Sequence, residues 1–583
     1  MYLDKINDVK DVKKIDLDKL SILSDEVRQA IINRVSKIGG HIGPNLGVVE
    51  LTVALHYVFN SPFDKIVFDV SHQCYAHKIL TGRKEAFLDD NHFHDVTGFT
   101  NPEESKHDIF KIGHTSTSIS LALGLALERD LKKTNENVIA VIGDGSLTGG
   151  EALEALNYAG EYKGNLIIIV NDNNQSIAEN HGGIYKNLKL LRENNGKCDN
   201  NFFESCGFEY HYLDDGNDVL KLVKLFKSIK NVDYPVVLHI HTIKGKGLKF
   251  AQEKKEIYHS GGPFDVVSGK YKFLPKQDDT VFDSLKNLLD NNDRAIVVNA
   301  ATPTVLGFTY DKRKKYVESG QFVDVGIAEE NAVAVAGGIA REGGTAVFGT
   351  TTAFMQRVYD QVSHDVCLNN LPVTFLLLRG GVYGMNSDTH LGLCDIQLFA
   401  HIPNLIYVAP STRGEYINAL KFATSQKNHP VGIRVPAKFS DINDDKFSLN
   451  NKVLLKGEGV AIFGVGKMID MAMAVASRLK KDNISVTVIN PLVLSNLDTS
   501  LLNELKLKHK LVITLEDGEL FGGYGTNIAS FYGNDNMKVL NFGISKKFHT
   551  DFDPDELLEE CGMSVSNICD VIYKFLNSKS YWA

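Results

Sequence analysis

Short segments rich in Val and Ile alternate with segments of helical pattern along almost the whole chain. The clearest example is a predicted strand at 137–142, a predicted helix at 150–159 and a second predicted strand at 165–170. Such alternation is typical of α/β proteins with parallel sheets. The right-handed crossover of this unit predicts that the loops beginning at Gly143 and Asn171 lie side by side, at the carboxyl ends of adjacent strands. Ligands bind at that edge of open α/β sheets.

The pattern of strands and helices restarts twice, after polar linkers at 261–279 and 436–451. Beyond the first linker we expect a helix at 330–340 and strands at 295–298, 323–325 and 373–378. Beyond the second we expect strands at 459–465, 485–489 and 511–515. The sequence therefore predicts three α/β domains, at 1–279, 280–446 and 447–583.

Composition narrows the class of protein further. The 583 residues are 43% hydrophobic, which is enough for several buried cores. Lys and Arg total 63 against 72 for Asp and Glu, and this net charge of -9 argues against nucleic acid as a partner. No apolar run approaches the roughly 20 residues of a membrane span, and residues 1–20 lack the apolar core of a targeting peptide. We therefore expect a cytoplasmic protein with no membrane partner, and the seven scattered cysteines favour unpaired thiols.

Two loop motifs follow the strands of the first predicted unit. Gly143-Asp144-Gly145 ends one strand, and Asn171-Asp172-Asn173 ends the next. The glycines allow a close backbone approach to a diphosphate, whose charge the following helix N-terminus helps to offset. The Asp144 carboxylate and the Asn173 side-chain oxygen are hard ligands suited to Mg²⁺. Gly-Asp-Gly alone is an ordinary turn sequence, but the pair of motifs at this spacing predicts a site for a diphosphate bridged by Mg²⁺.

A polar segment at 180–201 follows these motifs. It is rich in Asn, Gly and Lys and shows no clear periodicity. We expect a mobile loop over the ligand site there.

Several longer sequence words surround the two motifs. They read LGVVELT at 46–52, FDVSHQ at 68–73, HKILTGR at 77–83, GHTSTSIS at 113–120 and QRVYDQ at 356–361. Together with the motifs, they make the chain similar over nearly its whole length to the 1-deoxy-D-xylulose-5-phosphate synthase family of transketolase-like enzymes. The resemblance implies a thiamine-diphosphate-binding fold in the first two domains, a transketolase C-terminal-like third domain, and thiamine diphosphate and Mg²⁺ as cofactors.

The resemblance also implies roles for individual residues. In the family a glutamate of the second domain hydrogen-bonds the aminopyrimidine ring of the cofactor, and Glu329 in the word IAEEN matches it. Helix capping is the plainer interpretation of that glutamate, since acidic residues favour helix N-termini. Histidines transfer protons near neutral pH, and those of the family contact either the substrate or the cofactor. The matching catalytic residues are Glu329, His41, His259 and His390. The matching cofactor contacts are His72, Gly113, His114, Thr115, Gly145, Ser146, Asn173, Glu329 and Phe354, and the matching Mg²⁺ ligands are Asp144, Asn173 and Gln175.

The segments that recognise the aldehyde acceptor in the family differ here. The positions that match its substrate-binding residues are Arg357, Arg379, His390 and Asn386, the last replacing an aspartate. Where the family commonly has Arg-Tyr-Pro-Arg-Gly, this chain has RVPAK at 434–438, so Ala437 replaces a phosphate-binding arginine and Lys438 offers only a point charge. Thr351 also replaces a tyrosine. The loss of one charge-assisted contact weakens binding of a phosphorylated acceptor by about tenfold to a hundredfold.

By resemblance we expect a homodimer that condenses pyruvate with D-glyceraldehyde 3-phosphate, with decarboxylation, to 1-deoxy-D-xylulose 5-phosphate, a precursor of isoprenoids, thiamine and pyridoxal. The departures leave open a paralogue that uses a different aldehyde acceptor. Ketol transfer, oxidative decarboxylation with a lipoyl partner and a catalytically silent binding protein are further alternatives, and intact Glu329, Asp144 and Asn173 argue against silence. A nicotinamide oxidoreductase is the weakest alternative, because no Gly-x-Gly-x-x-Gly follows an early strand with an acidic residue about 20 positions on.

Overall fold

The computed structural model describes residues 1–273, 278–442 and 445–577. The chain divides into two compact units, one comprising Met1–Gln277 with Val325–Ala328 and the other Asp278–Asp324 with Glu329–Ala583. Parts of both predicted linkers, residues 274–277 and 443–444, lie outside the described residues. Within the described ranges no helix has the length and apolar character needed to cross a membrane. All seven cysteines lie in those ranges and are free thiols, as predicted.

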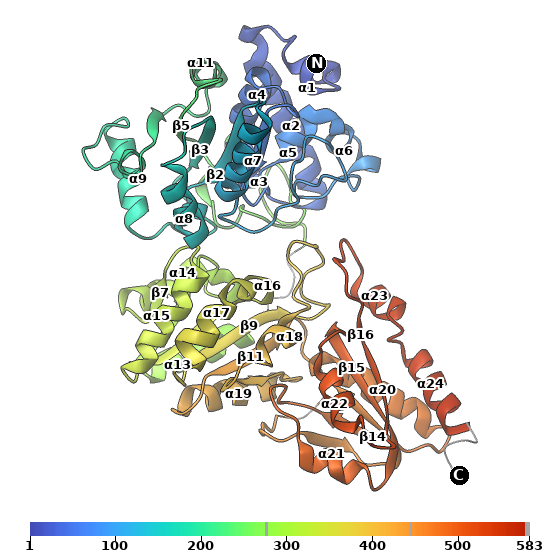
Figure 1. Ribbon diagram of the computed structural model, residues 1–583. Coiled ribbons are helices and arrows are strands. Elements are labelled where there is room, and N and C mark those ends of the chain that lie inside the picture. The colour runs from blue at the N-terminus through green and yellow to red at the C-terminus, as the bar shows by residue number, and fades with distance from the viewer. Residues whose placement is uncertain (274–277, 443–444, 578–583) are drawn as a thin grey trace. The chain divides into compact units, whose positions relative to one another are not determined.

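A five-stranded parallel sheet forms the centre of the first unit (Figure 1). Its order is β1-β2-β3-β5-β4, with β1 (Lys65–Phe68), β2 (Val138–Gly143), β3 (Leu166–Asp172), β4 (Glu209–Leu213) and β5 (Pro235–His241). Along β2, Ile139 and Val141 belong to the core on one face, and Val138, Ala140 and Ile142 belong to the core on the other. Because both faces are buried, the strand is a continuous apolar run without alternation.

Helices cover both faces of this sheet. The core on one face includes residues of α2 (Leu20–Ile38), α4 (Val49–Val58) and α11 (Val219–Ile229), and the core on the other includes residues of α7 (Ser118–Lys132) and α8 (Gly150–Ala159). The remaining helices of the unit are α1 (Val9–Val12), α3 (Ile42–Gly47), α5 (Tyr75–Lys78), α6 (Glu85–Leu88), α9 (Gly183–Glu193), α10 (Phe202–Ser205) and α12 (Lys249–Glu253). Short 3₁₀ or π turns cover Leu3–Lys5, Leu17–Lys19, Ile79–Arg83, Asp90–His92 and Gly145–Thr148.

The carboxyl ends of β2 and β3 are aligned. Gly143 pairs with Asn171 in the parallel register, and the Asp144 N–H donates to the Asn171 carbonyl oxygen at 3.1 Å. The predicted placement of the two motifs side by side at the ends of adjacent strands is therefore confirmed. The loop after β5 joins the same edge, because the Thr242 N–H donates to the Asp172 carbonyl oxygen at 2.9 Å.

The prediction of a loop throughout 180–201 is wrong, because α9 forms in its centre. Tyr185, Leu188 and Leu191 are buried in the core of the first unit. Their separation by three residues places these side chains on one face of a helix. The polar residues around them concealed this short amphipathic pattern in the sequence.

The described part of the second unit contains two sheets (Figure 1). The six-stranded parallel sheet has the order β10-β11-β9-β8-β6-β7, with β6 (Ala295–Asn299), β7 (Phe322–Asp324), β8 (Thr345–Thr351), β9 (Thr374–Gly380), β10 (Ile406–Val408) and β11 (Val431–Pro436). The five-stranded sheet has the order β12-β14-β13-β15-β16, with β12 (Lys452–Leu455) antiparallel to its neighbour and β13 (Gly459–Gly464), β14 (Thr487–Asn490), β15 (His509–Glu519) and β16 (Lys538–Ile544) parallel. Each strand predicted beyond residue 280 overlaps one of these strands.

The helices of the second unit surround both sheets. Those before β12 are α13 (Thr280–Asn291), α14 (Tyr310–Glu318), α15 (Glu329–Arg341), α16 (Thr352–Met355), α17 (Tyr359–Gln361), α18 (Asp395–Phe399) and α19 (Arg413–Ser425). Those after it are α20 (Ile469–Lys480), α21 (Thr499–Leu505), α22 (Tyr524–Tyr532), α23 (Pro554–Glu560) and α24 (Val565–Asn577). Short turns cover Pro303–Leu306, Gln356–Val358, Val362–Cys367 and Gly466–Met468. The predicted helix at 330–340 corresponds to α15.

A buried arginine connects the two sheets of the second unit. Arg434 on β11 is 1% exposed, and its Nε donates to Asp395 Oδ2 at 2.7 Å. Its Nη1 donates to Asp517 Oδ1, also at 2.7 Å, and Asp517 belongs to β15 of the other sheet. The Asp517 carbonyl oxygen in turn accepts from the Val382 N–H at 2.9 Å. Because these three charges are removed from water, each depends on the others for compensation.

Replacement of Arg434 by Met should therefore destabilise the second unit by about 3–5 kcal/mol, because two buried carboxylates lose their cation. Chemical denaturation monitored by proteolytic susceptibility of the second unit measures the change. The matched control is Arg478→Met, since Arg478 at the end of α20 forms an exposed ion pair with Asp482 at 3.1 Å that should contribute less than about 0.5 kcal/mol. Equal stability of the two variants would contradict a connecting role for Arg434.

Candidate active site

The loops after β2 and β3 surround the carboxylate of Asp144. This buried residue precedes the turn Gly145–Thr148, and its Oδ1 accepts from the Gly145 N–H at 3.0 Å. Its Oδ2 accepts from the Gln175 N–H at 3.1 Å and from the Asn180 side-chain amide at 2.8 Å. The structure thus brings together Asp144 and Gln175, two of the predicted metal ligands, and adds Asn180, which sequence reasoning missed.

Several buried oxygens in these loops have no hydrogen-bond partner among the described residues. They are Asn173 Oδ1, Ser176 Oγ and Asn180 Oδ1. Burial of an unpaired polar atom is costly, so these oxygens indicate a place for a cation or for a ligand that supplies donors. Burial and the nearby charge of Asp172 raise the pKa of Asp144, and a cation would offset that cost by favouring the ionised carboxylate. These oxygen donors fit a hard divalent cation such as Mg²⁺.

Asp172 fixes the turn that carries Asn173. Asp172 Oδ1 accepts from the Asn174 N–H at 3.0 Å, and Asn174 has a positive φ of 57°. Its Oδ2 accepts from His239 Nε2 at 2.8 Å and from Arg192 of α9. The helix that sequence reasoning missed therefore anchors the predicted metal-binding turn.

The loop 113–117 carries three predicted cofactor contacts, Gly113, His114 and Thr115, and is held by the buried carboxylate of Asp69. Asp69 accepts from the Ser116 N–H at 2.9 Å and from the Ser118 N–H at 3.1 Å. Ser116 has a positive φ of 77°, and its hydroxyl donates to the carbonyl oxygen of Ser146 at 2.8 Å. These bonds attach the predicted contacts of loop 113–117 to the predicted contact Ser146 after β2.

Three of the predicted histidines form one cluster in the first unit. The ring centroids of His41 and His72 are 5.1 Å apart, those of His41 and His259 are 5.6 Å apart, and those of His72 and His259 are 5.3 Å apart. Burial lowers the pKa of His259 well below its ordinary value, so this imidazole is neutral at pH 7. Residues far apart in the sequence, at 41, 72 and 259, are thus gathered around one point.

Lys244 completes this cluster and was not identified from the sequence. The side chain is 1% exposed, its Nζ lies 3.1 Å from His259 Nδ1, and it donates to the carbonyl oxygen of Ser176. Burial lowers the pKa of Lys244 to about 7. A lysine among several in the segment TIKGKGLK gives no local signal of burial, so only the fold identifies it.

In the second unit, Glu329 begins α15 and is 3% exposed. Its Oε2 has no hydrogen-bond partner among the described residues and lies 3.7 Å from Arg357 Nη1. Burial raises the pKa of Glu329 to about 6. A capping carboxylate is normally solvated or bonded to backbone N–H groups. Capping alone therefore does not explain a buried oxygen that makes no hydrogen bond.

Two other predicted residues of the second unit contact each other. The ring of Phe354 on α16 lies 5.6 Å from the ring of His390 in an edge-on arrangement. The hydroxyl of Thr389 lies 2.8 Å from His390 Nδ1, and burial lowers the pKa of His390 to about 4. His390 is therefore a neutral imidazole beside an aromatic face.

Arg379 and Asn386 are two further positions that match substrate-binding residues of the family. Arg379 lies near the end of β9 with a positive φ of 58°. Asn386 is exposed, its amide donates to the Phe552 carbonyl oxygen at 3.4 Å, and its own carbonyl oxygen accepts from the Asp551 N–H at 2.7 Å. The structure thus places Asn386 against the segment 551–552.

Family models match successive parts of the chain. Residues 3–197 match the model of 1-deoxy-D-xylulose-5-phosphate synthase. Residues 119–297 match the thiamine diphosphate binding domain of transketolase, 279–439 match its pyrimidine binding domain and 450–568 match its C-terminal domain. These matches confirm the predicted fold class and thiamine diphosphate as the cofactor.

Curated relatives match nearly the whole chain. A 1-deoxy-D-xylulose-5-phosphate synthase from Caldanaerobacter subterraneus subsp. tengcongensis is 38% identical, over 98% of this chain and 98% of its own length. One from Clostridium tetani is 37% identical, over 98% of this chain and 99% of its own length. With this identity over 98% of its length, the chain belongs to the 1-deoxy-D-xylulose-5-phosphate synthase family.

Proposed function

We propose that this chain condenses pyruvate with D-glyceraldehyde 3-phosphate to form 1-deoxy-D-xylulose 5-phosphate and CO₂. The proposal rests mainly on one observation: over 98% of its length, the chain is 38% and 37% identical to two synthases of that product. Two features of the chain support it. The oxygens around Asp144 suit a metal-bridged diphosphate, and the buried carboxyl of Glu329 suits a nitrogen of the aminopyrimidine ring.

Thiamine diphosphate, when bound, supplies the electron sink for decarboxylation of pyruvate. We assign Mg²⁺ to the side-chain oxygens of Asp144, Asn173 and Gln175, and the cation that they would hold would offset part of the diphosphate charge. The loops that carry Gly113, His114, Thr115, Gly145 and Ser146 bind the diphosphate end, together with His72. Phe354 offers an aromatic face to the ring end.

Glu329 holds and returns a proton at Oε2. A pKa of about 6 allows both the protonated and the ionised carboxyl to be populated near neutral pH. The unpaired oxygen can therefore donate to a ring nitrogen, and the Arg357 cation 3.7 Å away stabilises the ionised form. This combination suits a general acid and base better than a structural ion pair.

His41, His259 and His390 act on the substrates in this proposal. A neutral imidazole can donate at one ring nitrogen and accept at the other, as proton transfer to a carbonyl or carbinol oxygen requires. Lys244 orients His259 through the 3.1 Å contact between their nitrogens. Arg357, Arg379 and Asn386 complete the proposed substrate contacts.

We also propose a homodimer and three domains at 1–279, 280–446 and 447–583. The three-domain division is supported by one sheet in each segment, since β1–β5, β6–β11 and β12–β16 fall within those bounds.

The first test is identification of the product by NMR from pyruvate with a panel of phosphorylated and unphosphorylated aldehydes. We expect 1-deoxy-D-xylulose 5-phosphate with CO₂ release, and faster turnover of glyceraldehyde 3-phosphate than of glyceraldehyde. Equal rates for the two aldehydes would reject the proposed acceptor and favour a paralogue with another acceptor. Turnover without CO₂ would indicate ketol transfer.

Replacement of Glu329 by Gln keeps the side-chain shape but removes the titratable proton. We expect kcat to fall by about a hundredfold or more, because general acid–base catalysis contributes on that order. Deuterium exchange at the thiazolium C2 position of the bound cofactor should slow in parallel. The matched control is the exposed Glu342→Gln, just after α15, which should stay within about twofold of the wild type. Unchanged C2 exchange in the Glu329 variant would contradict its assignment.

Replacement of Asp144 by Asn tests the metal assignment. Thiamine diphosphate binding in Mg²⁺ should weaken by at least about tenfold, since even outer partners of metal ligands contribute that much. Titration calorimetry with Mg²⁺ and with a chelator measures the effect, and chelation should abolish tight binding to the wild type. The exposed Asp199→Asn variant serves as the control. Affinity that is the same with and without Mg²⁺ would overturn the assignment.

A further inference from the structure

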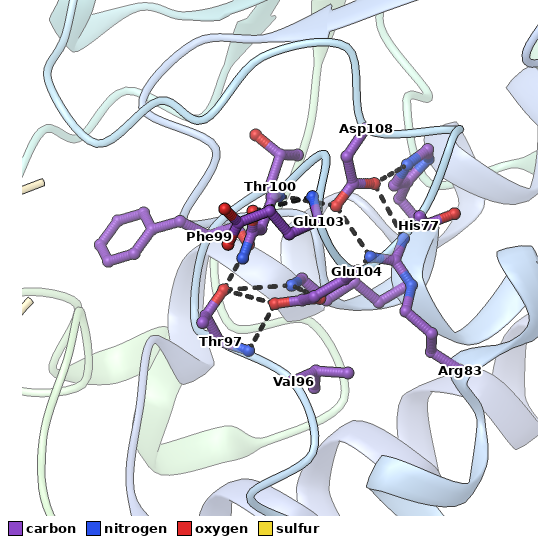
Figure 2. A network of polar contacts seen from close by, with 12 residues as sticks. His77, Arg83, Val96, Thr97, Phe99, Thr100, Glu103, Glu104 and Asp108 are labelled. Carbon is purple, nitrogen blue, oxygen red and sulfur yellow. Dashed lines mark hydrogen bonds and ion pairs between the residues drawn. The ribbon is translucent and has the colours of Figure 1, made fainter. Parts of the chain in front are cut away.

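A mostly buried cluster of charges surrounds Arg83 and Asp108 in the first unit (Figure 2). Arg83 donates from Nη1 to Asp108 Oδ2 and from Nη2 to Asp108 Oδ1, both at 2.8 Å. Arg83 also donates to Glu104 Oε2 at 3.0 Å, and Lys78 donates to the same oxygen. Two carboxylates and two cations therefore compensate one another where Lys78 and Asp108 are fully buried and Arg83 and Glu104 are about 10% exposed. His77 Nε2 adds a bond to Asp108 Oδ1 at 2.9 Å.

The two carboxylates of this cluster also bind one short segment, residues 97–101, which we call the Phe99 strip. Glu104 Oε1 accepts from the Thr97 N–H at 2.8 Å and from the Thr97 hydroxyl at 2.7 Å. Asp108 Oδ2 accepts from the Asn101 N–H at 2.8 Å. The strip lies outside the helices and strands, so the two carboxylates fix both of its ends in place of regular backbone pairing.

The opposite side of the Phe99 strip faces the proposed active site. Figure 2 shows the Phe99 side chain directed away from Asp108 and Arg83. Its ring centroid lies 5.8 Å from that of His41, in an edge-on arrangement. Edge-on aromatic contacts prefer a defined orientation, so the position of Phe99 constrains the imidazole of His41.

The Phe99 strip also supports the turn before His72. The Thr100 N–H donates to Ser71 Oγ at 2.9 Å, and that hydroxyl donates to the Ile112 carbonyl oxygen at 2.9 Å. Val70 and Ser71 have positive φ values of 59° and 66°, which are costly for residues other than glycine. A strained turn persists only where surrounding bonds hold it, and one of those bonds comes from the strip.

We propose that Asp108 and Glu104 are positioning residues for this enzyme, which act through the Phe99 strip to orient His41 and to hold the strained turn before His72. This inference rests on the proposed function, because it assigns the two histidines to the reaction. Neither carboxylate need touch substrate or cofactor. Their effect passes through the amides of Thr97 and Asn101 to Phe99 and Thr100.

Kinetics of the variants Asp108→Asn and Phe99→Ala, alone and combined, test the proposal in the full chain with thiamine diphosphate and Mg²⁺. Each single variant should lower kcat/KM per cofactor-binding site by about tenfold to a hundredfold, the loss expected from slight misplacement of reacting groups. The double variant should lie within about twofold of the more damaged single variant, because both changes act through one strip. If the two losses multiply in the double variant, the proposal is overturned. Asp108→Asn would then act independently of Phe99, for example through a general loss of folding.

Two further variants serve as a substitute and as a control in this test. Glu104→Gln should reproduce the non-additive pattern if Asp108→Asn fails to fold. Glu103→Gln is the matched control, because the neighbouring Glu103 side chain is 84% exposed and pairs only loosely with Lys111 at 3.6 Å. A loss of activity in the control equal to that in Glu104→Gln would contradict the proposal.

Hydrogen exchange measured by mass spectrometry provides a test that does not depend on turnover. Asp108→Asn should speed amide exchange in peptides covering 97–101 and 69–73, and leave the buried strand at 138–143 unchanged. Unchanged exchange in both peptides would overturn the inference even if the enzyme is active. Absence of product with the wild-type chain would reject the proposed function instead, and the exchange result would still report on the strip.

Discussion

Parallel strands that end in register force the loops after them to share one edge of the sheet, and the proposed cofactor site depends on this constraint. The pairing of Gly143 with Asn171 brings Asp144 within hydrogen-bonding distance of the turn after β3. No single loop supplies the required oxygens. The site instead needs two neighbouring strands that end at the same level of the sheet. The continuous apolar sequences of β2 and β3 keep both strands in the interior of the sheet, where both faces are buried.

Three buried carboxylates of the first unit hold loops in place, and Glu329 of the second unit differs from them. Asp69, Asp108 and Asp172 each accept a backbone N–H group of a loop, from Ser116, Asn101 and Asn174. Ser116 and Asn174 have positive φ values. Glu329 differs, because one of its oxygens is buried without a hydrogen-bond partner among the described residues and its pKa is raised to about 6. The unused acceptor and the raised pKa together give Glu329 the capacity to exchange a proton.

The sequence predicted the features that are local and periodic. The strands at 137–142 and 165–170, the helix at 150–159 and the edge shared by Asp144 and Asn173 follow from apolar runs and turn residues. The helix α9 was missed because its three buried residues lie among many polar ones, so its amphipathic signal is short. Lys244 and Asp69 could not have been identified as site residues from local pattern, since their burial depends on contacts with residues distant in the sequence.

In the segment that matches the family's binding site for the aldehyde acceptor, the neighbouring cations do not replace the missing arginine. Ala437 occupies a position where the family commonly has arginine, and Arg434 lies three residues before it. Arg434 cannot take over phosphate binding, because it is 1% exposed and its Nε and Nη1 are bonded to Asp395 and Asp517, which themselves require it. Lys438 is exposed, with its Nζ 5.3 Å from the centre of the Tyr383 ring, so it contributes a solvated charge on a flexible stem. If the proposed function holds, recognition of a phosphorylated acceptor would therefore depend more heavily on Arg379, whose backbone has a left-handed conformation near the end of β9.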